Sequence, residues 1–511
     1  MIDRRGFLIG SGQLALAAAL SGSSIGAATA APPAESDPSY LPAAELLKRF
    51  RSGELSPVDV LEAQIKRIEG LNAEVNCITY KHYDEARTAA QESAQRYKAG
   101  NPRPLEGITV AVKDEYDVKG WITTMGSLRL ENAAPAAGDG AVIDMLRKAG
   151  AVLHIQTTVP EFYVWMTTAS RLWGVTRNPW NLAYSPGGSS GGSGSALAAG
   201  FTTLALGSDM GGSIRLPSSL CGLYGYKPPF GRVPTSEIPY ETDGPMARTF
   251  DDLNLFIQAI SGPHPLVHSS LRPKLDFPNT YGPVDGWKIA YDPMKGISSL
   301  DPPVAEAMEK AIGVLKGLGV TVETIDLGFA AADLNVYMPG LFSTSMGSML
   351  TEAAKDMDKL TPYTRQVIEK MTVNSGPDAA NATDMLLADY HTRVQEKVFG
   401  QGFNALIAPV MATALVPAEH GLKPETDAVL IDGKPVTGLG FAATWPWNLL
   451  GRYPVVAAPA EIGPGNMPIG FQIIGNTFDD LTAFQLASAY ASAAPPLFSG
   501  EAFPDFRDDP V

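Results

Sequence analysis

The chain of 511 residues has only two cysteines and six histidines. Cys77 and Cys221 lie far apart in the sequence, so a disulfide is not excluded, but two buried thiols are the favoured state. The histidines form no H-E-x-x-H pair, and His264 and His268, four residues apart, lie in a proline-containing loop. The sequence therefore predicts no metal site and no other cofactor.

Positive charge is also scarce. Lysine and arginine number 39 against 54 acidic residues, which gives a formal net charge of -15 and a sequence pI near 4.9. No cluster of lysine and arginine is long enough to form a cationic stripe. Nucleic acid and anionic membrane surfaces are therefore disfavoured as partners.

Long hydrophobic runs are missing as well. The apolar segment 9–20 is too short and too rich in glycine and serine to span a bilayer stably, so no stable membrane insertion is expected. It follows the twin arginine Arg4-Arg5 and precedes the small-residue site Ala28-Thr29-Ala30. This combination predicts a twin-arginine export signal over residues 1–31, with the twin-arginine export machinery as a partner and a periplasmic or secreted mature protein. The alternative is an amphipathic N-terminal tail.

The rest of the chain has the composition of an ordinary globular protein, with 45% hydrophobic and 18% charged residues. Continuous apolar strands such as 107–112 and 151–155 alternate with helices such as 141–149. This alternation predicts an α/β fold whose mixed, mostly buried central sheet is covered by helices on both faces. No repeat or linker divides the chain, so we expect one large domain over 40–497, with a mainly helical insertion or cap at about 330–390.

The most informative segment spans 185–217 and reads SPGGSSGGSGSALAAGFTTLALGSDMGGSIRLP. A flexible linker would not continue directly into an apolar stretch, and a phosphate-binding P-loop would need a lysine after its glycines. Glycine before serine frees the backbone and lets its N–H groups approach a ligand closely. A hydroxyl beside such donors suits acyl transfer.

Three elements of the sequence combine into one pattern. Lys113 ends a buried strand, Ser189 lies in the first Gly/Ser block, and Ser213 lies in the later Gly-Gly-Ser step. Each alone has a structural explanation, as a solvated strand-end lysine or a turn serine. Together, and in this order, they resemble the amidase signature family of serine hydrolases. The resemblance covers almost the whole mature chain and includes the motifs Val112-Lys113-Asp114, Asn178-Pro179-Trp180-Asn181, Gly222-Leu223-Tyr224-Gly225-Tyr226-Lys227-Pro228 and Met467-Pro468-Ile469-Gly470-Phe471-Gln472.

The resemblance implies the amidase signature fold and a Ser-Ser-Lys triad. Ser213 would be the nucleophile, Ser189 the bridging serine that follows a cis peptide, and Lys113 the base. A lysine must be neutral to accept a proton, and burial against apolar neighbours such as Val110 and Val112 favours the neutral form. Ser189 can then relay a proton from Ser213 to Lys113 and later return one to the leaving amine.

The loop before the nucleophile is the candidate oxyanion hole. The backbone N–H groups of Met210, Gly211 and Gly212, with that of Ser213, could converge on one point because glycine permits it. Three further residues match those that hold the loops by hydrogen bonds in the family: Ser190, Asp209 and Arg215. For these three the alternative is loop capping and a surface ion pair.

Large side chains between the lysine strand and the Gly/Ser block are candidates for the substrate pocket. They lie where relatives often build the acyl-side wall: Phe162, Tyr163, Trp165, Met166 and Trp173. Such a wall favours aryl or bulky apolar groups, and core packing is the alternative. Trp445, Pro446 and Trp447 are candidates for the opposite side. Gln156 and Thr158 depart from the usual family pattern, so the substrate cannot be carried over from a relative.

These observations predict an exported serine amidase of the linear-amide type. It would hydrolyse the C–N bond of a small-molecule carboxamide, anilide, peptide amide or carbamate through an acyl-enzyme. One alternative is the glutaminase subunit of a tRNA-dependent amidotransferase, against which export argues. The other is a periplasmic binding protein that has lost the chemistry.

Overall fold

The computed structural model describes residues 37–511 apart from 236, 373, 424–427 and 501. The predicted export signal at 1–31 lies outside the described residues. Within the described part of the chain, no helix is both long enough and apolar enough to cross a membrane.

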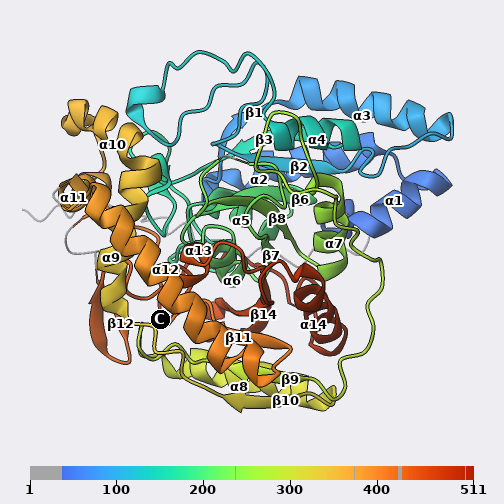
Figure 1. Cartoon of the computed structure of the whole chain (residues 1–511). Coiled ribbons are helices and arrows are strands. Elements are labelled where there is room, and N and C mark those ends of the chain that lie inside the picture. The colour runs from blue at the N-terminus through green and yellow to red at the C-terminus, as the bar shows by residue number, and fades with distance from the viewer. Residues whose placement is uncertain (1–36, 236, 373, 424–427, 501) are drawn as a thin grey trace, which may run out of the picture.

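A mixed sheet of eleven strands runs through the molecule (Figure 1). The strands follow the order β1-β3-β2-β6-β8-β7-β14-β15-β11-β9-β10. Parallel pairs form near both ends of the sheet, β2 with β3 and β6, and β9 with β10 and β11, whereas the edge pair β1 with β3 and the central pairs are antiparallel. The bounds are β1 (Ile78–Lys81), β2 (Thr109–Lys113), β3 (Val152–Thr157), β6 (Leu204–Asp209), β7 (Tyr224–Lys227), β8 (Thr242–Ala247), β9 (Lys288–Tyr291), β10 (Thr321–Thr324), β11 (Ala405–Pro409), β14 (Val455–Ile462) and β15 (Pro468–Ile474).

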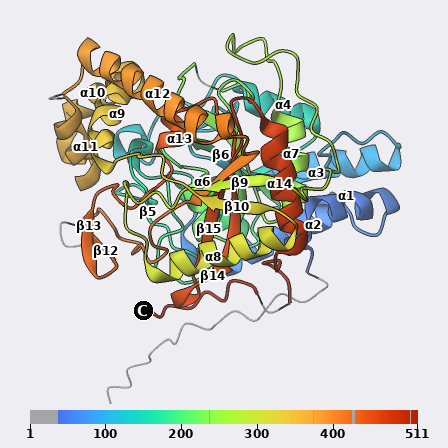
Figure 2. The same ribbon diagram turned by 60° about the horizontal axis from the view of Figure 1, so that its bottom comes forward.

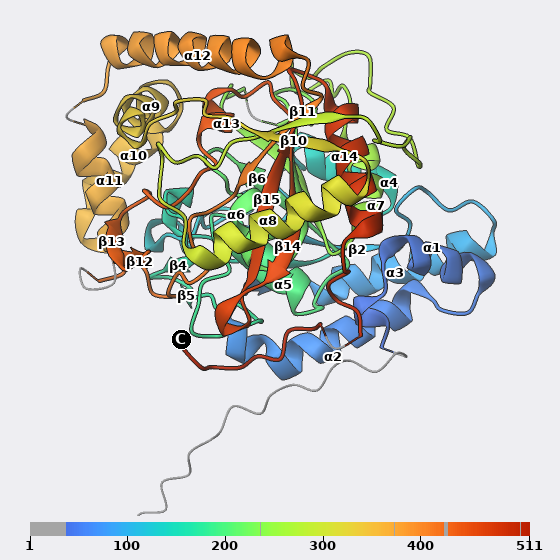
Figure 3. The ribbon, with the colours of Figure 1, turned by 90° about the horizontal axis from the view of Figure 1, so that it is seen from below.

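Helices cover both faces of this sheet (Figure 3), which confirms the predicted fold class. Successive residues of a strand point to opposite faces. Accordingly Val110 and Val112 belong to a core that includes residues of α4 (Ala141–Ala149), α7 (Phe250–Ile260) and α14 (Asp480–Ala493). Ala111 belongs to a second core with α5 (Gly191–Ala198) and α6 (Arg215–Leu220). Lys113, two residues after Ala111, therefore points toward the face that carries α5 and α6.

The remaining helices of the sheet region are α1 (Ala43–Ser52), α2 (Pro57–Val75), α3 (Tyr83–Lys98), α8 (Pro302–Gly317) and the short α13 (Pro446–Leu449). Helix α2 begins where the sequence indicates: the Ser56 side chain accepts from the N–H of Val58, and the Asp59 side chain accepts from the N–H of Ser56. This capping box, followed by proline in the first turn, fixes the start of the helix. Two small hairpins lie outside the main sheet, β4 (Ala169–Ser170) with β5 (Gly174–Val175) and β12 (Ala428–Ile431) with β13 (Lys434–Thr437).

A group of helices at one end of the molecule forms what we call the helical cap (Figures 1 and 2). It consists of α9 (Leu334–Leu341), a π-helical turn at Phe342–Met346, α10 (Gly347–Ala353), α11 (Pro362–Thr372) and α12 (Pro377–Lys397). Residues of α10 and α11 share a core with Phe162 and Trp165. The cap therefore packs directly over the aromatic segment that the sequence singled out.

Candidate active site

The first Gly/Ser block is buried throughout and lies against the chain at 158–168. A Cβ on Gly192 would lie 2.5 Å from the backbone nitrogen of Thr158, and one on Gly188 would lie 2.9 Å from the carbonyl oxygen of Trp165. Glycine is therefore required by close packing of two backbones, not by flexibility. The peptide bond between Gly188 and Ser189 is cis, and α5 begins two residues after Ser189.

Lys113 ends β2 with no exposed surface, and its side chain reaches the first Gly/Ser block. Its Nζ lies 2.8 Å from Ser189 Oγ, 2.7 Å from Ser208 Oγ and 2.7 Å from Glu115 Oε2. The Tyr163 ring centroid is 4.9 Å from the same nitrogen. Val110 and Val112, the apolar neighbours expected to bury the lysine, pack in the core on the other face of the sheet, so the nitrogen lies beside two hydroxyls and a carboxylate instead.

Ser208 and Glu115 are contacts that the sequence analysis missed. Ser208 also donates to Glu115 Oε2 at 2.6 Å, so the lysine, the serine and the carboxylate form a closed triangle. The sequence offered a weak signal, because Glu115 follows Lys113 by two residues and Ser208 stands next to Asp209. Only the parallel pairing of β2 with β6 brings these two strand ends together.

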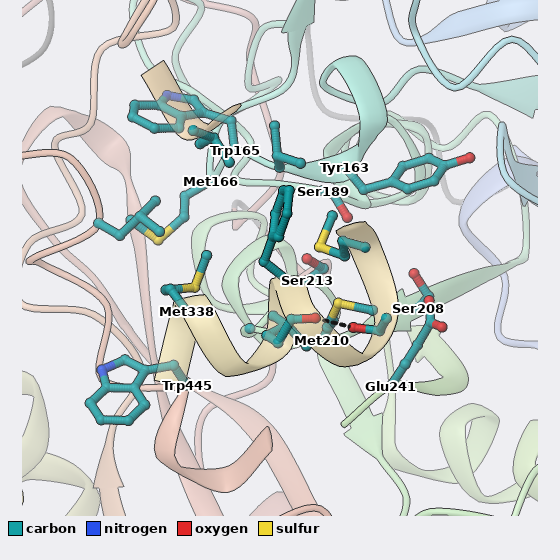
Figure 4. Close-up of a pocket in the computed structure, with 18 of the residues that line it drawn as sticks. Tyr163, Trp165, Met166, Ser189, Ser208, Met210, Ser213, Glu241, Met338 and Trp445 are labelled. Carbon is teal, nitrogen blue, oxygen red and sulfur yellow. Dashed lines mark hydrogen bonds between the residues drawn. The ribbon is translucent and has the colours of Figure 1, made fainter. Parts of the chain in front are cut away.

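Ser213 lies between β6 and α6. The N–H of Ser190 donates to its carbonyl oxygen at 3.3 Å, and the Ser190 hydroxyl donates to the carbonyl oxygen of Ser208 at 3.3 Å. Ser190 thus joins the two Gly/Ser elements, as predicted for a residue that holds the loops. Ser189 and Ser213 line the same cavity (Figure 4).

Only some of the N–H groups of the predicted oxyanion loop could bind an oxyanion. The N–H of Gly212 donates to Asp209 Oδ1 at 2.8 Å, so the prediction that Gly212 contributes a donor to the cavity is wrong. The N–H groups of Gly211 and Ser213 have no acceptor among the residues that the structure describes. Met210, Gly211 and Ser213 all line the cavity. These positions remain the candidates for stabilising an oxyanion.

Asp209 and Arg215 form a fully buried ion pair, which excludes the alternative of a surface pair. Arg215 donates to both carboxylate oxygens of Asp209 and also contacts the carbonyl of Thr444, Gln472 Oε1 and Asn448 Oδ1. Burial alone would raise the pKa of Asp209, but the charge and hydrogen bonds of Arg215 outweigh it and lower that pKa to about 2. Asp209 is therefore a fixed anion between β6 and the loop that carries Ser213.

The cavity has a volume of about 290 Å³ and a mainly apolar wall. Tyr163, Trp165 and Met166 line it, as predicted (Figure 4). Seven of the chain's sixteen methionines also line it: Met125, Met166, Met210, Met338, Met346, Met349 and Met371. Methionine side chains adapt to irregular shapes, so this wall suits varied apolar groups.

Three predicted pocket residues lie elsewhere. Trp447 has no exposed surface and packs against Tyr453 and Phe329, so its assignment to the pocket is wrong; Trp445 lines the cavity instead. Phe162 packs in the core beneath the cap. The indole of Trp173 donates to Thr124 Oγ1 at 2.9 Å outside the cavity lining.

The charged groups on the described wall of the cavity are carboxylates, Glu115 and Glu241, and no lysine, arginine or histidine of the described residues lines it. Asp243 lies behind them on β8, where burial and the nearby Glu115 charge raise its pKa to about 7. Lys113 lies behind Ser189. The electrostatic character of the wall is therefore neutral to negative.

A family model described as Amidase matches residues 59–483. The chain belongs to the amidase signature family. Across 480 residues it is 32% identical to a glutamyl-tRNA(Gln) amidotransferase subunit of Geobacter metallireducens, covering 88% of this chain and 96% of that protein. It is 28% identical to an acylamidase of Rhodococcus erythropolis, covering 89% of this chain and 96% of that one. A crystal structure of a bacterial aryl acylamidase of the amidase signature family superposes with a TM-score of 0.82 at 28% identity, covering 89% of this chain and 96% of that one.

Proposed function

We propose that this amidase signature enzyme hydrolyses amides that carry an aryl or bulky apolar group, through an acyl-enzyme on Ser213. The observation that carries the proposal is the contact of Lys113 Nζ with Ser189 Oγ at 2.8 Å, beside a methionine- and aromatic-lined cavity that both serines share. The similarity to an acylamidase and to an aryl acylamidase supports the same class of substrate.

The reaction follows from the roles of these groups. Ser213 Oγ attacks the amide carbonyl carbon while its proton passes through the Ser189 hydroxyl to neutral Lys113. The oxygen that becomes negative is stabilised by the N–H groups of Gly211 and Ser213. The proton returns through Ser189 to the nitrogen, the C–N bond breaks and the amine leaves. Water then attacks the ester on Ser213 by the same proton route and releases the acid.

The wall of the cavity argues against the amidotransferase alternative. Free glutamine carries an α-carboxylate, and a site that binds it needs a cation or an equivalent set of donors. Two glutamates and no cationic side chain of the described residues line this cavity. The similarity to the amidotransferase protein therefore supports shared chemistry at the serine better than a shared substrate.

Labelling and turnover together test the enzyme proposal. The wild-type protein is treated with a fluorophosphonate probe and assayed on aryl anilides, primary amides, amino-acid amides, carbamates and glutamine. We expect labelling of Ser213 and hydrolysis of the anilides or bulky amides in preference to glutamine. Ser213→Ala should abolish both, Lys113→Ala should nearly abolish turnover, and Ser189→Ala should leave a small residual rate. Loss of general-base catalysis costs about 100-fold or more, so a Lys113→Ala rate within about tenfold of wild type would refute its role.

A serine outside the cavity provides the control. Ser195 on α5 is buried and donates its hydroxyl to the carbonyl oxygen of Arg177 at 3.0 Å. Ser195→Ala should keep both labelling and turnover. A wild-type protein that binds amides but is neither labelled nor active would support the binding-protein alternative instead.

We also propose that residues 1–31 direct export by the twin-arginine route. The support is the order of Arg4-Arg5, the modestly apolar segment 9–20 and Ala28-Thr29-Ala30. Replacing both arginines by lysine should retain the protein in the cytoplasm, whereas the wild-type chain should appear in the periplasmic or secreted fraction. Equal distribution of the two chains would contradict the proposal.

A further inference from the structure

Two side chains from distant parts of the sequence hold the carbonyl groups of the loop before the nucleophile. The Tyr337 hydroxyl donates to the carbonyl oxygen of Met210 at 3.0 Å. The Thr444 hydroxyl donates to the carbonyl oxygen of Gly211 at 2.6 Å. Tyr337 lies on α9 of the helical cap, and Thr444 lies just before α13.

A carbonyl held in this way fixes the N–H of the following residue. Both peptide bonds of the loop are trans, and in a trans peptide the C=O and the N–H point to opposite sides of the chain. The Gly211–Gly212 peptide is held at both ends, because Thr444 binds its oxygen and Asp209 accepts from its N–H at 2.8 Å. The Met210–Gly211 peptide is held at its oxygen by Tyr337, while its N–H, that of Gly211, has no acceptor among the described residues.

The orientation of this peptide would be easy to lose. Met210 and Gly211 are partly exposed at the cavity, and a glycine adopts backbone angles that other residues avoid. A rotated peptide would present the carbonyl oxygen, rather than the N–H, to a developing negative charge. The Tyr337 ring is itself well fixed: it is 1% exposed, stacks on Trp445 at 5.7 Å and meets the edge of Tyr240 at 5.8 Å.

We propose that Tyr337 is a positioning residue that orients the Met210–Gly211 peptide so that the Gly211 N–H faces the oxyanion. The inference rests on the proposed hydrolysis at Ser213. It also connects the cap to the chemistry, because α9 supplies both this hydroxyl and cavity-lining residues such as Met338 (Figure 4). A substrate group that settles against α9 therefore contacts the same helix that sets the oxyanion donor.

The decisive variant is Tyr337→Phe, which keeps the ring contacts and removes only the hydroxyl. We expect kcat to fall by about 10- to 100-fold with KM changed by less than about twofold, since the lost interaction acts in the transition state. The rate of fluorophosphonate labelling should fall in parallel, because that adduct also develops negative charge on oxygen. Binding of an intact aryl amide, measured with Ser213→Ala present in both chains, should be unchanged.

A second tyrosine of the cap provides the matched control. Tyr363 on α11 is 2% exposed and donates its hydroxyl to the carbonyl oxygen of Ala169 at 2.6 Å, away from the oxyanion loop. Its hydroxyl also accepts from the N–H of Glu161 at 2.7 Å, so Tyr363→Phe loses at least as much buried hydrogen bonding as Tyr337→Phe and should still keep kcat within about threefold of wild type. Near-UV circular dichroism of both variants verifies that each is folded.

Three outcomes would overturn the inference. Tyr337→Phe could raise KM with kcat unchanged, which would make Tyr337 only a part of the wall. It could leave both constants unchanged. Both tyrosine variants could lose kcat equally, which would indicate a general effect of the cap. Failure of the proposed function has a separate signature, namely that Ser213→Ala retains hydrolysis in an otherwise wild-type chain.

Discussion

The Arg215 guanidinium and the Asp209 carboxylate pair at 2.8 Å, and neither side chain has exposed surface. The nucleophile candidate Ser213 stands between them in the sequence. Asp209 also accepts from the N–H groups of Gly212 and Ile214, so the pair holds the loop on both sides of Ser213. The ion pair and the loop that carries Ser213 are therefore one structural unit.

Breaking this pair should cost much more stability than breaking an exposed one. Arg215→Met leaves the Asp209 carboxylate buried without its cation, and we expect a loss of about 3–5 kcal/mol in the free energy of unfolding. Arg507, 37% exposed and paired with Asp505 at 2.6 Å, is the control, and Arg507→Met should cost about 1 kcal/mol or less. Urea unfolding measures both. Equal losses in the two variants would show that burial of the Asp209–Arg215 pair does not increase the stability lost when the pair is broken.

Asp243 should make the stability of the protein depend on pH. Its carboxyl is 4% exposed and accepts from the Tyr116 hydroxyl at 3.0 Å. Burial, aided by the Glu115 charge, raises its pKa to about 7 against weaker opposition from the hydrogen bonds of Thr235 and Tyr116. Because the folded pKa is raised, the stability that this group contributes is full below about pH 4 and is lost as the pH rises through about 7. Each pH unit in that window costs about 1.4 kcal/mol at most.

Asp243→Asn removes this titration. At about pH 8 the variant should exceed the wild type in free energy of unfolding by about 1–3 kcal/mol, and at about pH 4 the gain should vanish. The exposed Asp378 on α12 provides the control, since Asp378→Asn should change stability by less than about 0.5 kcal/mol at either pH. A gain at pH 4 equal to that at pH 8 would assign the effect to packing.

The close contact of the first Gly/Ser block with the chain at 158–168 could be anticipated from the sequence, because two backbones that pack closely require glycine. Gly188 and Gly192, which make two of these contacts, therefore appear in the sequence as part of a glycine-rich motif. The contacts of Ser208 and Tyr337 could not be predicted, since they depend on strand pairing and on the docking of α9 across 95 to 127 residues.

The two tryptophans near 446 show a limit of local reasoning. Helix α13 is a single turn that begins at Pro446, and residues two apart on a helix face different directions. Trp445 thus faces the cavity while Trp447 enters the core. The sequence marked the pair of rings as candidates but contained no signal for which of them turns inward.

Alanine should affect stability at only one of the two adjacent loop glycines. Gly212 has φ of 125°, and a Cβ there would clash with the Thr444 hydroxyl and lie 2.7 Å from the Thr444 Cβ. Gly212→Ala should lower the free energy of unfolding by about 1–3 kcal/mol and reduce kcat, because it strains the loop. A Cβ on Gly211 would meet no atom within 4 Å.

Gly211→Ala should therefore keep the stability within about 0.5 kcal/mol of wild type while its methyl group narrows the cavity. The expected readout is a rise in KM that is larger for bulky amides than for small ones. A similar loss of stability in both variants, by thermal or urea unfolding, would contradict the packing argument. A loss of stability in Gly211→Ala alone would show that Gly211, and not Gly212, is the closely packed position.

The acidic wall should make the enzyme discriminate against anionic substrates. Glu241 lines the cavity, and a carboxylate at about 8 Å from it in an effective dielectric of about 40 is disfavoured by about 1 kcal/mol, or about fivefold in kcat/KM. Glu241→Gln should therefore improve kcat/KM for a carboxylated anilide by about fivefold relative to its neutral isostere. Glu309→Gln, on the exposed side of α8, should leave the ratio unchanged. Because part of the field crosses solvent, added salt should shrink the wild-type discrimination. A ratio that stays the same in Glu241→Gln would place the origin of the discrimination in shape rather than in charge.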